Sequence, residues 1–156
     1  SELCYEARKI VNSHPNRLNM VYNIALEKNR VIIFYNFDYE LELLHQLFDE
    51  SVFTVAEWNG HKHQPVPEST CWVYFVQYTA GSEAWNCITT DTIIFFSQNY
   101  SYKVMKQASG RINRLNTPYK DLYYYHLKSR SGIDVAISKA LKSKKKFNET
   151  RFVTGG

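Results

Sequence analysis

The amino-acid sequence predicts an α/β fold, with a mainly parallel sheet of five to six strands flanked by helices. Five short segments are rich in β-branched and aromatic residues, which favours strands. Several of them are apolar at nearly every position, as is typical of strands covered on both faces. Helical patterns alternate with these segments, and 156 residues with 44% hydrophobic composition suit one domain. The expected strands are residues 31–37, 52–58, 72–78, 92–97 and 121–127.

Helices are expected before, between and after these strands. Leu3, Ala7, Ile10 and Val11 predict an opening helix, and a second helix should begin near Pro15. After Asp38, the expected N-cap, apolar residues recur at helical spacing through about residue 49. Ser131 and Asp134 have capping-box spacing before Ile133, Ile137 and Leu141, which predicts a final helix. Residues 59–70 contain two prolines and no periodicity, so we expect a long loop there.

Composition limits the class of protein. A net charge of +4 permits a phosphate-bearing partner without requiring one. The three cysteines are far apart in sequence, which argues against a zinc site and a disulfide framework. Apolar stretches are too short to span a membrane and no signal sequence is evident, so we expect a cytoplasmic protein. We expect a single domain over residues 1–156, cut from a longer chain, with leading helices over 1–30 and a basic tail over 142–156.

Residues 101–115 are the most informative segment, because as a helix they would present two faces. Met105, Ala108, Ile112 and Leu115 would share an apolar side. Gln107, Arg111 and Arg114 would then share another side and present two guanidinium groups together. Gly110 would cost about 1 kcal/mol in a helix, which suggests that another group approaches closely there.

Two neighbouring arginines suit phosphoryl transfer, because guanidinium groups match the negative charge of its transition state. This interpretation requires the guanidinium groups to face the edge of the sheet where the strands end. The alternative is that Arg111 and Arg114 are ordinary surface residues of an amphipathic helix.

The sequences of these segments resemble conserved motifs of superfamily 2 helicases. Residues 107–114, Gln-Ala-Ser-Gly-Arg-Ile-Asn-Arg, resemble motif VI. Residues 79–86 resemble motif V and residues 31–36 resemble motif IV, in family order. Over residues 17–145 the chain is similar to the C-terminal RecA-like (P-loop NTPase-like) domain of these motors. Its sequence resembles most closely the phage or prophage DNA helicases related to the chromatin-remodeller branch. This resemblance implies that the protein acts in a bacterial or phage-infected cell.

The resemblance implies a role for each matching residue. Arg114 would be the arginine finger toward ATP, Arg111 would contact phosphate or couple the site, and Gln107 would position the pair. Asn86 and Glu83 would lie near the nucleotide. The implied nucleic-acid contacts are Tyr35, Asn36, Thr79, Ala80 and Gly81.

Some positions depart from the family pattern or allow another interpretation. Ala84 and Trp85 replace the usual glycine and aliphatic residue of motif V. Tyr35 could equally pack under the following helix. Trp58, His61, Lys62 and His63 in the long loop could contact a nucleic-acid strand, or could simply be exposed.

The sequence contains no Gly-x-x-x-x-Gly-Lys-Ser/Thr loop and no Asp-Glu pair after an apolar strand. ATP and Mg²⁺ would therefore be held mainly by an N-terminal RecA-like domain of the same polypeptide, and folding would require neither. This chain alone should not hydrolyse ATP. The rival interpretations are a non-catalytic basic α/β module that binds nucleic acid or protein, and a nuclease or restriction-subunit motor. No acidic residues cluster at metal-ligand spacing, which disfavours the nuclease.

Overall fold

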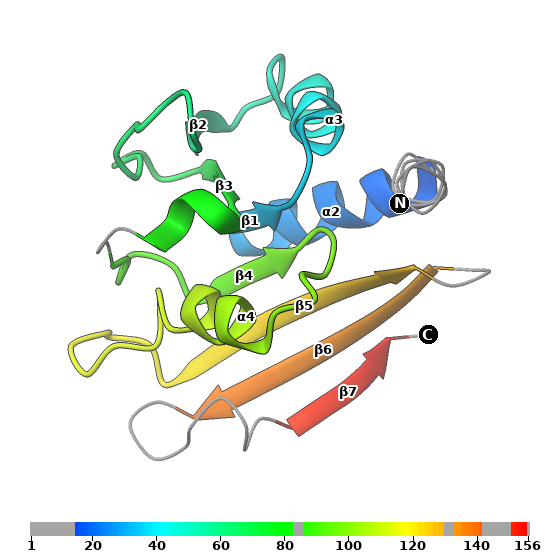
Figure 1. Ribbon diagram of the computed structural model, residues 1–156. Coiled ribbons are helices and arrows are strands. Elements are labelled where there is room, and N and C mark those ends of the chain that lie inside the picture. The colour runs from blue at the N-terminus through cyan, green and yellow to red at the C-terminus, as the bar shows by residue number, and fades with distance from the viewer. Residues whose placement is uncertain (1–14, 83–85, 130–132, 142–150, 156) are drawn as a thin grey trace.

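The computed structural model describes residues 15–82, 86–129, 133–141 and 151–155. Its strands form one seven-stranded sheet in the order β2-β3-β1-β4-β5-β6-β7 (Figure 1). The strands are β1 Arg30–Tyr35, β2 Thr54–Trp58, β3 Trp72–Gln77, β4 Thr92–Phe95, β5 Asp121–Ser129, β6 Ile133–Leu141 and β7 Arg151–Gly155. The helices are α2 Pro15–Lys28, α3 Asp38–Phe48, the short 3₁₀ helix η1 Tyr78–Ser82, and α4 Tyr102–Ser109.

The first five strands are parallel, as the sequence predicts. β1 lies between β3 and β4, while β2 pairs with β3 and β5 pairs with β4. Each predicted strand is present, and the predicted ends differ from the observed ends by no more than two residues. The expected helices that begin near Pro15 and Asp38 are also present, whereas the predicted opening helix over residues 3–11 lies outside the described residues.

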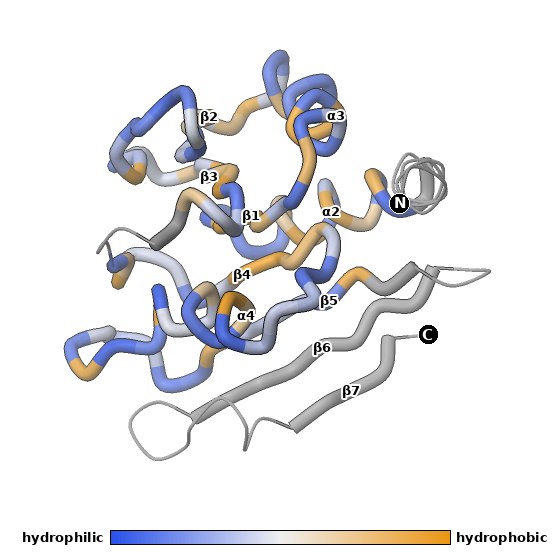
Figure 2. The backbone as a smooth tube through the Cα atoms, in the orientation of Figure 1, coloured by the Kyte–Doolittle hydropathy of each residue, from blue (hydrophilic) through white to orange (hydrophobic). Residues whose placement is uncertain are grey.

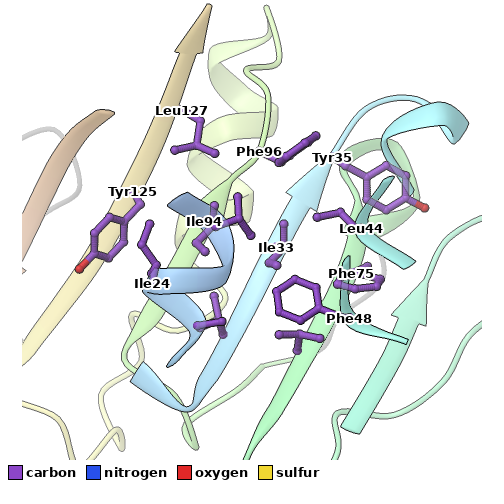
Figure 3. Packing of buried hydrophobic residues seen from close by; sticks show 14 of the residues in the cluster. Ile24, Ile33, Tyr35, Leu44, Phe48, Phe75, Ile94, Phe96, Tyr125 and Leu127 are labelled. Carbon is purple, nitrogen blue, oxygen red and sulfur yellow. The ribbon is translucent and has the colours of Figure 1, made fainter. Parts of the chain in front are cut away.

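Alternate residues of the strands build two separate hydrophobic cores. One core contains Ile33, Phe75 and Ile94 and is covered by α2 and α3 through Ile24, Leu44 and Phe48 (Figure 3). The other contains Ile32, Tyr74 and Phe95 and is covered by Ala108 and Ile112. Figure 2 shows hydrophobic residues in the central strands and hydrophilic residues along the connecting loops. Because both faces are covered, the central strands β1, β3 and β4 are buried along nearly their whole length.

Helices α2 and α4 therefore lie on opposite faces of the sheet, α4 in front of β4 and β5 in the view of Figure 1. This placement follows from the apolar residues of each helix. Val21, Ile24 and Ala25 recur at three- and four-residue intervals along α2 and are all buried. The prediction of Asp38 as the N-cap of α3 is wrong by one residue. Phe37 is the N-cap, and Glu40 Oε1 accepts from its backbone N–H at 2.9 Å.

The carboxyl-terminal part corrects two predictions. Residues 133–141, expected in a final helix, form strand β6, which pairs antiparallel with β5 from Ile133 opposite Ser129 to Leu141 opposite Asp121. Residues 151–155, assigned to a basic tail, form strand β7 against β6. Ile133, Val135 and Ile137 fit a two-residue period as well as a helical one, and a long neighbouring strand favours the extended form. The lysines of the expected tail, in 142–146, lie outside the described residues.

The predicted loop over residues 59–70 contains no helix or strand, and local hydrogen bonds fix its path. Asn59 Oδ1 accepts from the backbone N–H groups of His61 and Lys62, and the Tyr74 hydroxyl donates to the Gln64 carbonyl at 2.6 Å. The Trp58 ring stacks on His63 with centroids 4.6 Å apart. None of the helices in the described ranges has the length and hydropathy needed to cross a membrane.

Candidate functional site

Strands β1 and β4 end side by side, and the chain leaves them in opposite directions. After β1 it enters α3, which covers one face, and after β4 it enters α4, which covers the other. In open α/β sheets this arrangement marks the usual ligand-binding position, at the carboxyl ends of the strands. The predicted contact Asn36 follows β1 immediately and lies at this position.

Asn36 ties the carboxyl ends of three neighbouring strands together. Its side-chain amide donates to Ser97 Oγ at 2.8 Å and to the Gln98 carbonyl at 2.9 Å. Its side-chain oxygen accepts from Asn99 Nδ2 at 3.0 Å, and its carbonyl accepts from Gln77 Nε2 at 3.3 Å. The result is a polar cluster, the Asn36 cluster, made of Asn36, Gln77, Ser97, Gln98 and Asn99.

Tyr35 does not join this cluster. Its side chain is fully buried in the core beneath α3, beside Leu44 (Figure 3). Burial raises the pKa of its hydroxyl well above the ordinary value. The expectation that Tyr35 contacts a nucleic-acid backbone is therefore contradicted in this conformation, and the alternative of packing under the following helix is correct. Residues 31, 33 and 35 share one face of β1, which places Tyr35 in the core.

The segment that resembles motif V, residues 79–86, begins at the same edge. Thr79 is exposed and Ala80 is half-buried in η1, directly after β3. The Trp58 indole N–H donates to the Ala80 carbonyl at 3.1 Å, which joins η1 to the end of β2. Gly81 belongs to the same short helix, whereas Glu83 lies outside the described residues.

The predicted helix over residues 101–115 is too long by about two turns. α4 ends at Ser109, and Gly110 is its C-cap with φ −70° and ψ −10°. Arg111 and Arg114 therefore lie in a turn beyond the helix, so the prediction that they share a helical face with Gln107 is wrong. Gln107 is exposed on α4 itself, and Leu115, expected on the apolar side, is 87% exposed.

The turn that carries the arginines, residues 110–117, is anchored at several points. Ile112 is fully buried in the core on the α4 side of the sheet. The Arg111 carbonyl accepts from the backbone N–H of Cys87 at 2.9 Å, and the Arg114 carbonyl accepts from that of Thr117 at 3.2 Å. The first of these backbone bonds joins the arginine turn to Cys87, the residue directly after the segment that resembles motif V.

The two guanidinium groups are close enough to influence one another. Burial, together with the positive charge of Arg114, lowers the pKa of Arg111 below its ordinary value. The Arg111 side chain is half-buried and that of Arg114 is exposed. Within the described ranges, the Arg114 side chain makes no ion pair or hydrogen bond. Two adjacent cations with one exposed form a favourable position for a phosphate group.

This turn does not lie at the carboxyl edge of the sheet, so the expectation that the two guanidinium groups face the edge where the strands end is wrong. A helix between two parallel strands runs back along the sheet, so residues 110–120 return the chain to the amino end of β5. Asn86, the predicted nucleotide contact, lines a cleft of about 370 Å³ at this amino edge. Arg30, the first residue of β1, and Trp72, the first residue of β3, line the same cleft.

The predicted residues therefore separate into two groups. Asn86, Arg111 and Arg114 lie toward the amino edge, and Asn36, Thr79 and Ala80 lie at the carboxyl edge. The prediction missed Gln77, Gln98 and Asn99. Gln77 is the last residue of β3, and Gln98 and Asn99 lie three and four residues after the end of β4. Polar residues that come after an apolar strand were a signal that the sequence contained.

The described residues contain no group of three or more His, Cys, Asp or Glu side chains that could hold a metal ion. The acidic side chains near the carboxyl edge have other partners. Glu57 Oε1 lies 3.0 Å from His45 Nε2, and Glu57 Oε2 accepts from Asn59 Nδ2 at 2.6 Å. The donors at the arginine turn suit a phosphate group, and a Mg²⁺ ion would need carboxylates from elsewhere.

Comparison with solved structures identifies the fold. The chain is similar to the crystal structure of the C-terminal part of the Fun30 ATPase domain, with a TM-score of 0.65 and 15% sequence identity. The fold is RecA-like. The similarity covers 74% of this chain and 42% of that chain, so this chain spans less than half of the solved one. No family model and no curated protein matches the sequence.

Proposed function

We propose that this chain is the C-terminal motor domain of an ATP-dependent DNA helicase or translocase. Its RecA-like fold and its similarity to part of an ATPase domain support the general class. The observation that carries the proposal is the anchored turn over residues 110–117, which carries both Arg111 and Arg114 and is joined by a backbone hydrogen bond to Cys87, directly after the segment that resembles motif V. The sequences of the motif-like segments further favour a phage-type cytoplasmic enzyme. This assignment stays a prediction.

The arginine turn would complete an ATP site that is held by another domain. An N-terminal RecA-like domain of the same polypeptide would hold ATP and Mg²⁺, and the exposed Arg114 would reach the terminal phosphate. Arg111, half-buried and held by its carbonyl contact with Cys87, would fix the position of this turn and contribute a second positive charge. Fixed guanidinium groups stabilise charge that develops in the transition state without having to reorganise.

The Asn36 cluster and η1 would contact nucleic acid at the other edge of the sheet. Thr79 is exposed, and the hydrogen bonds of Asn36 and Trp58 hold the loops around it in fixed positions. Polar side chains and backbone groups of this kind bind phosphates without reading sequence. In this proposal the two edges perform separate tasks, nucleotide sensing at the amino edge and strand contact at the carboxyl edge.

Replacing Arg114 with alanine in the full-length protein tests this proposal. Loss of an arginine finger lowers turnover by about a thousand-fold or more. We therefore expect DNA-stimulated ATP hydrolysis to fall by that order while the thermal unfolding midpoint is unchanged, because the side chain is exposed. Steady-state ATPase assays and thermal unfolding measure the two quantities.

Lys120→Ala is the matched control, because Lys120 is an exposed cation just beyond the arginine turn and before β5. Its ATPase activity should stay near that of the wild type. Unchanged turnover in Arg114→Ala would remove this residue from the mechanism and favour the non-catalytic basic module.

A further inference from the structure

One segment of the chain carries several positive charges and no negative charge. Residues 92–120 contain Lys103, Lys106, Arg111, Arg114 and Lys120 and no aspartate or glutamate. The net charge of this segment, +5, exceeds the +4 of the whole chain. Most of the segment is α4 and its flanking loops on one face of the sheet (Figure 1). A surface of one sign attracts a polyanion.

Two tyrosines at the start of α4 are unusually exposed. Tyr100 is 90% exposed and Tyr102 is 63% exposed, whereas Tyr74 and Tyr124 are buried in the core behind α4. Lys103, Lys106 and Gln107 are exposed on the same helix. The rings of Tyr100 and Tyr102 therefore do not contribute to the core. An exposed aromatic surface of this kind commonly binds a partner.

The backbone around these tyrosines is held in place. Asn99 Oδ1 accepts from the backbone N–H of Ser101 at 2.9 Å, and Ser101 caps α4 by accepting from Val104 N–H at 3.3 Å. Asn99 also donates to Asn36, so Tyr100 lies one residue from the Asn36 cluster. The rings are therefore carried by a fixed segment at the carboxyl edge of the sheet.

We propose that Tyr100 and Tyr102 form a stacking platform for the bases of a single-stranded nucleic acid, with Lys103 and Lys106 contacting its phosphates. This inference rests on the proposed function and specifies the state of the bound nucleic acid. Aromatic rings next to cations are the pattern by which proteins hold unpaired strands, because every base has a face that can stack. A protein partner fits less well, since lysine is depleted at the centre of protein interfaces.

Binding of labelled oligonucleotides to the 156-residue chain tests the platform. The probes are a mixed-sequence single strand, an abasic strand of the same length with the same phosphates, and the matching duplex. Fluorescence anisotropy should show tighter binding to the normal strand than to the abasic strand. Tyr100→Ala combined with Tyr102→Ala should weaken binding to the normal strand by roughly ten-fold or more and bring it to the abasic level.

Two further variants separate stacking from charge. Tyr100→Phe with Tyr102→Phe should bind nearly as tightly as the wild type, because the rings remain. Lys103→Gln with Lys106→Gln should weaken all three probes and flatten the dependence of affinity on salt. Leu26→Ala, a half-exposed position on α2 at the opposite face, is the control and should change nothing.

Equal affinity for normal and abasic strands in the wild type would overturn the platform while leaving nucleic-acid binding intact. Failure to bind any probe would overturn both the platform and nucleic-acid contact by this chain. If the alanine pair leaves all three probes unaffected but weakens binding of the separately produced N-terminal domain, the surface is a protein interface and the platform is wrong. The ATPase assay with Arg114→Ala is independent of all these outcomes.

Discussion

Arg17 is a fully buried cation on α2, and it connects this helix to two strand ends. Its guanidinium donates to the Phe96 carbonyl at 2.7 Å and to the Leu127 carbonyl at 3.2 Å. Burial lowers its pKa, and the negative charge of Glu40 partly offsets that effect. The sequence pattern placed a helix here but did not indicate this residue, because an arginine before an apolar stripe usually faces solvent.

Arg17→Met should destabilise the fold, since methionine fills similar space but cannot donate to the two carbonyls. Each buried acceptor that loses its donor costs about 1–3 kcal/mol. We expect the free energy of unfolding to fall by about 2–4 kcal/mol in urea denaturation. Lys106→Met, at an exposed position, should change it by less than about 0.5 kcal/mol. A loss of similar size in both variants would mean that Arg17 makes no specific contribution.

Gly110 is not required by the fold of this chain. Its φ of −70° is accessible to any residue, and an added Cβ would lie 3.5 Å from the carbonyl oxygens of Gln107 and Lys106, an ordinary contact. Gly110→Ala should therefore leave the free energy of unfolding unchanged or raise it by up to about 1 kcal/mol. If another domain approaches closely here, DNA-stimulated ATPase should nevertheless fall several-fold in the full-length protein. Full activity in a stable variant would show that nothing packs against this position.

Tyr35 and Asn36 show the limit of prediction at a single residue. The sequence correctly placed both at the end of β1, but it could not show which neighbour reaches solvent. A strand apolar on both faces has no polar side to set the orientation of its last residue. The observed packing decides it, with residues 31, 33 and 35 directed into one core and Asn36 at the first position past the strand.

At the scale of elements, the α4 prediction failed at its end rather than at its start. Ser101 caps the helix, and the buried Ala108 and Ile112 match the predicted apolar stripe. Gly110 and the following polar residues end the helix, as glycine often does near helix ends. The pairing of Arg111 with Arg114 survives because the turn brings them together, whereas their common face with Gln107 does not.

The buried tyrosines of the strands predict sensitivity to alkaline pH. Burial raises the pKa of Tyr74 and of Tyr125 to about 12, from an ordinary value of 10.0. A raised folded-state pKa favours the neutral form, so its contribution to stability is complete below pH 10 and is lost as pH rises toward 12. The free energy of unfolding should therefore decline between pH 10 and 12. Tyr74→Phe should reduce that slope in denaturation curves, and an unaltered slope would show that Tyr74 does not cause it.

At the scale of the whole molecule, the order of strands and helices was predictable because it rests on repeated local signals. Five apolar runs alternate with helical stripes, and parallel strands covered on both faces follow from that alternation. The antiparallel extension by β6 and β7 was not predictable. It depends on pairing with the nine-residue β5, a contact between segments whose own patterns allow either helix or strand.

The architecture also explains why two sets of predicted residues separate. β4 ends at the carboxyl edge beside the Asn36 cluster, and α4 carries the chain back to the arginine turn at the amino edge. Eight helical residues span about 12 Å. Helix α4 therefore joins the edge proposed to bind nucleic acid to the turn proposed to sense the nucleotide. A displacement of one end of α4 would move the other end as well.

Photocrosslinking tests the central claim most directly, namely that this chain completes an ATP site held by another domain. The full-length protein would be irradiated with an ATP analogue that carries its photoreactive group on the γ-phosphate, with and without excess ATP. Mass spectrometry should locate ATP-competable crosslinks within the arginine turn, residues 110–117. Crosslinks confined to the rest of the polypeptide, or found in this chain only at the Asn36 cluster, would contradict the account.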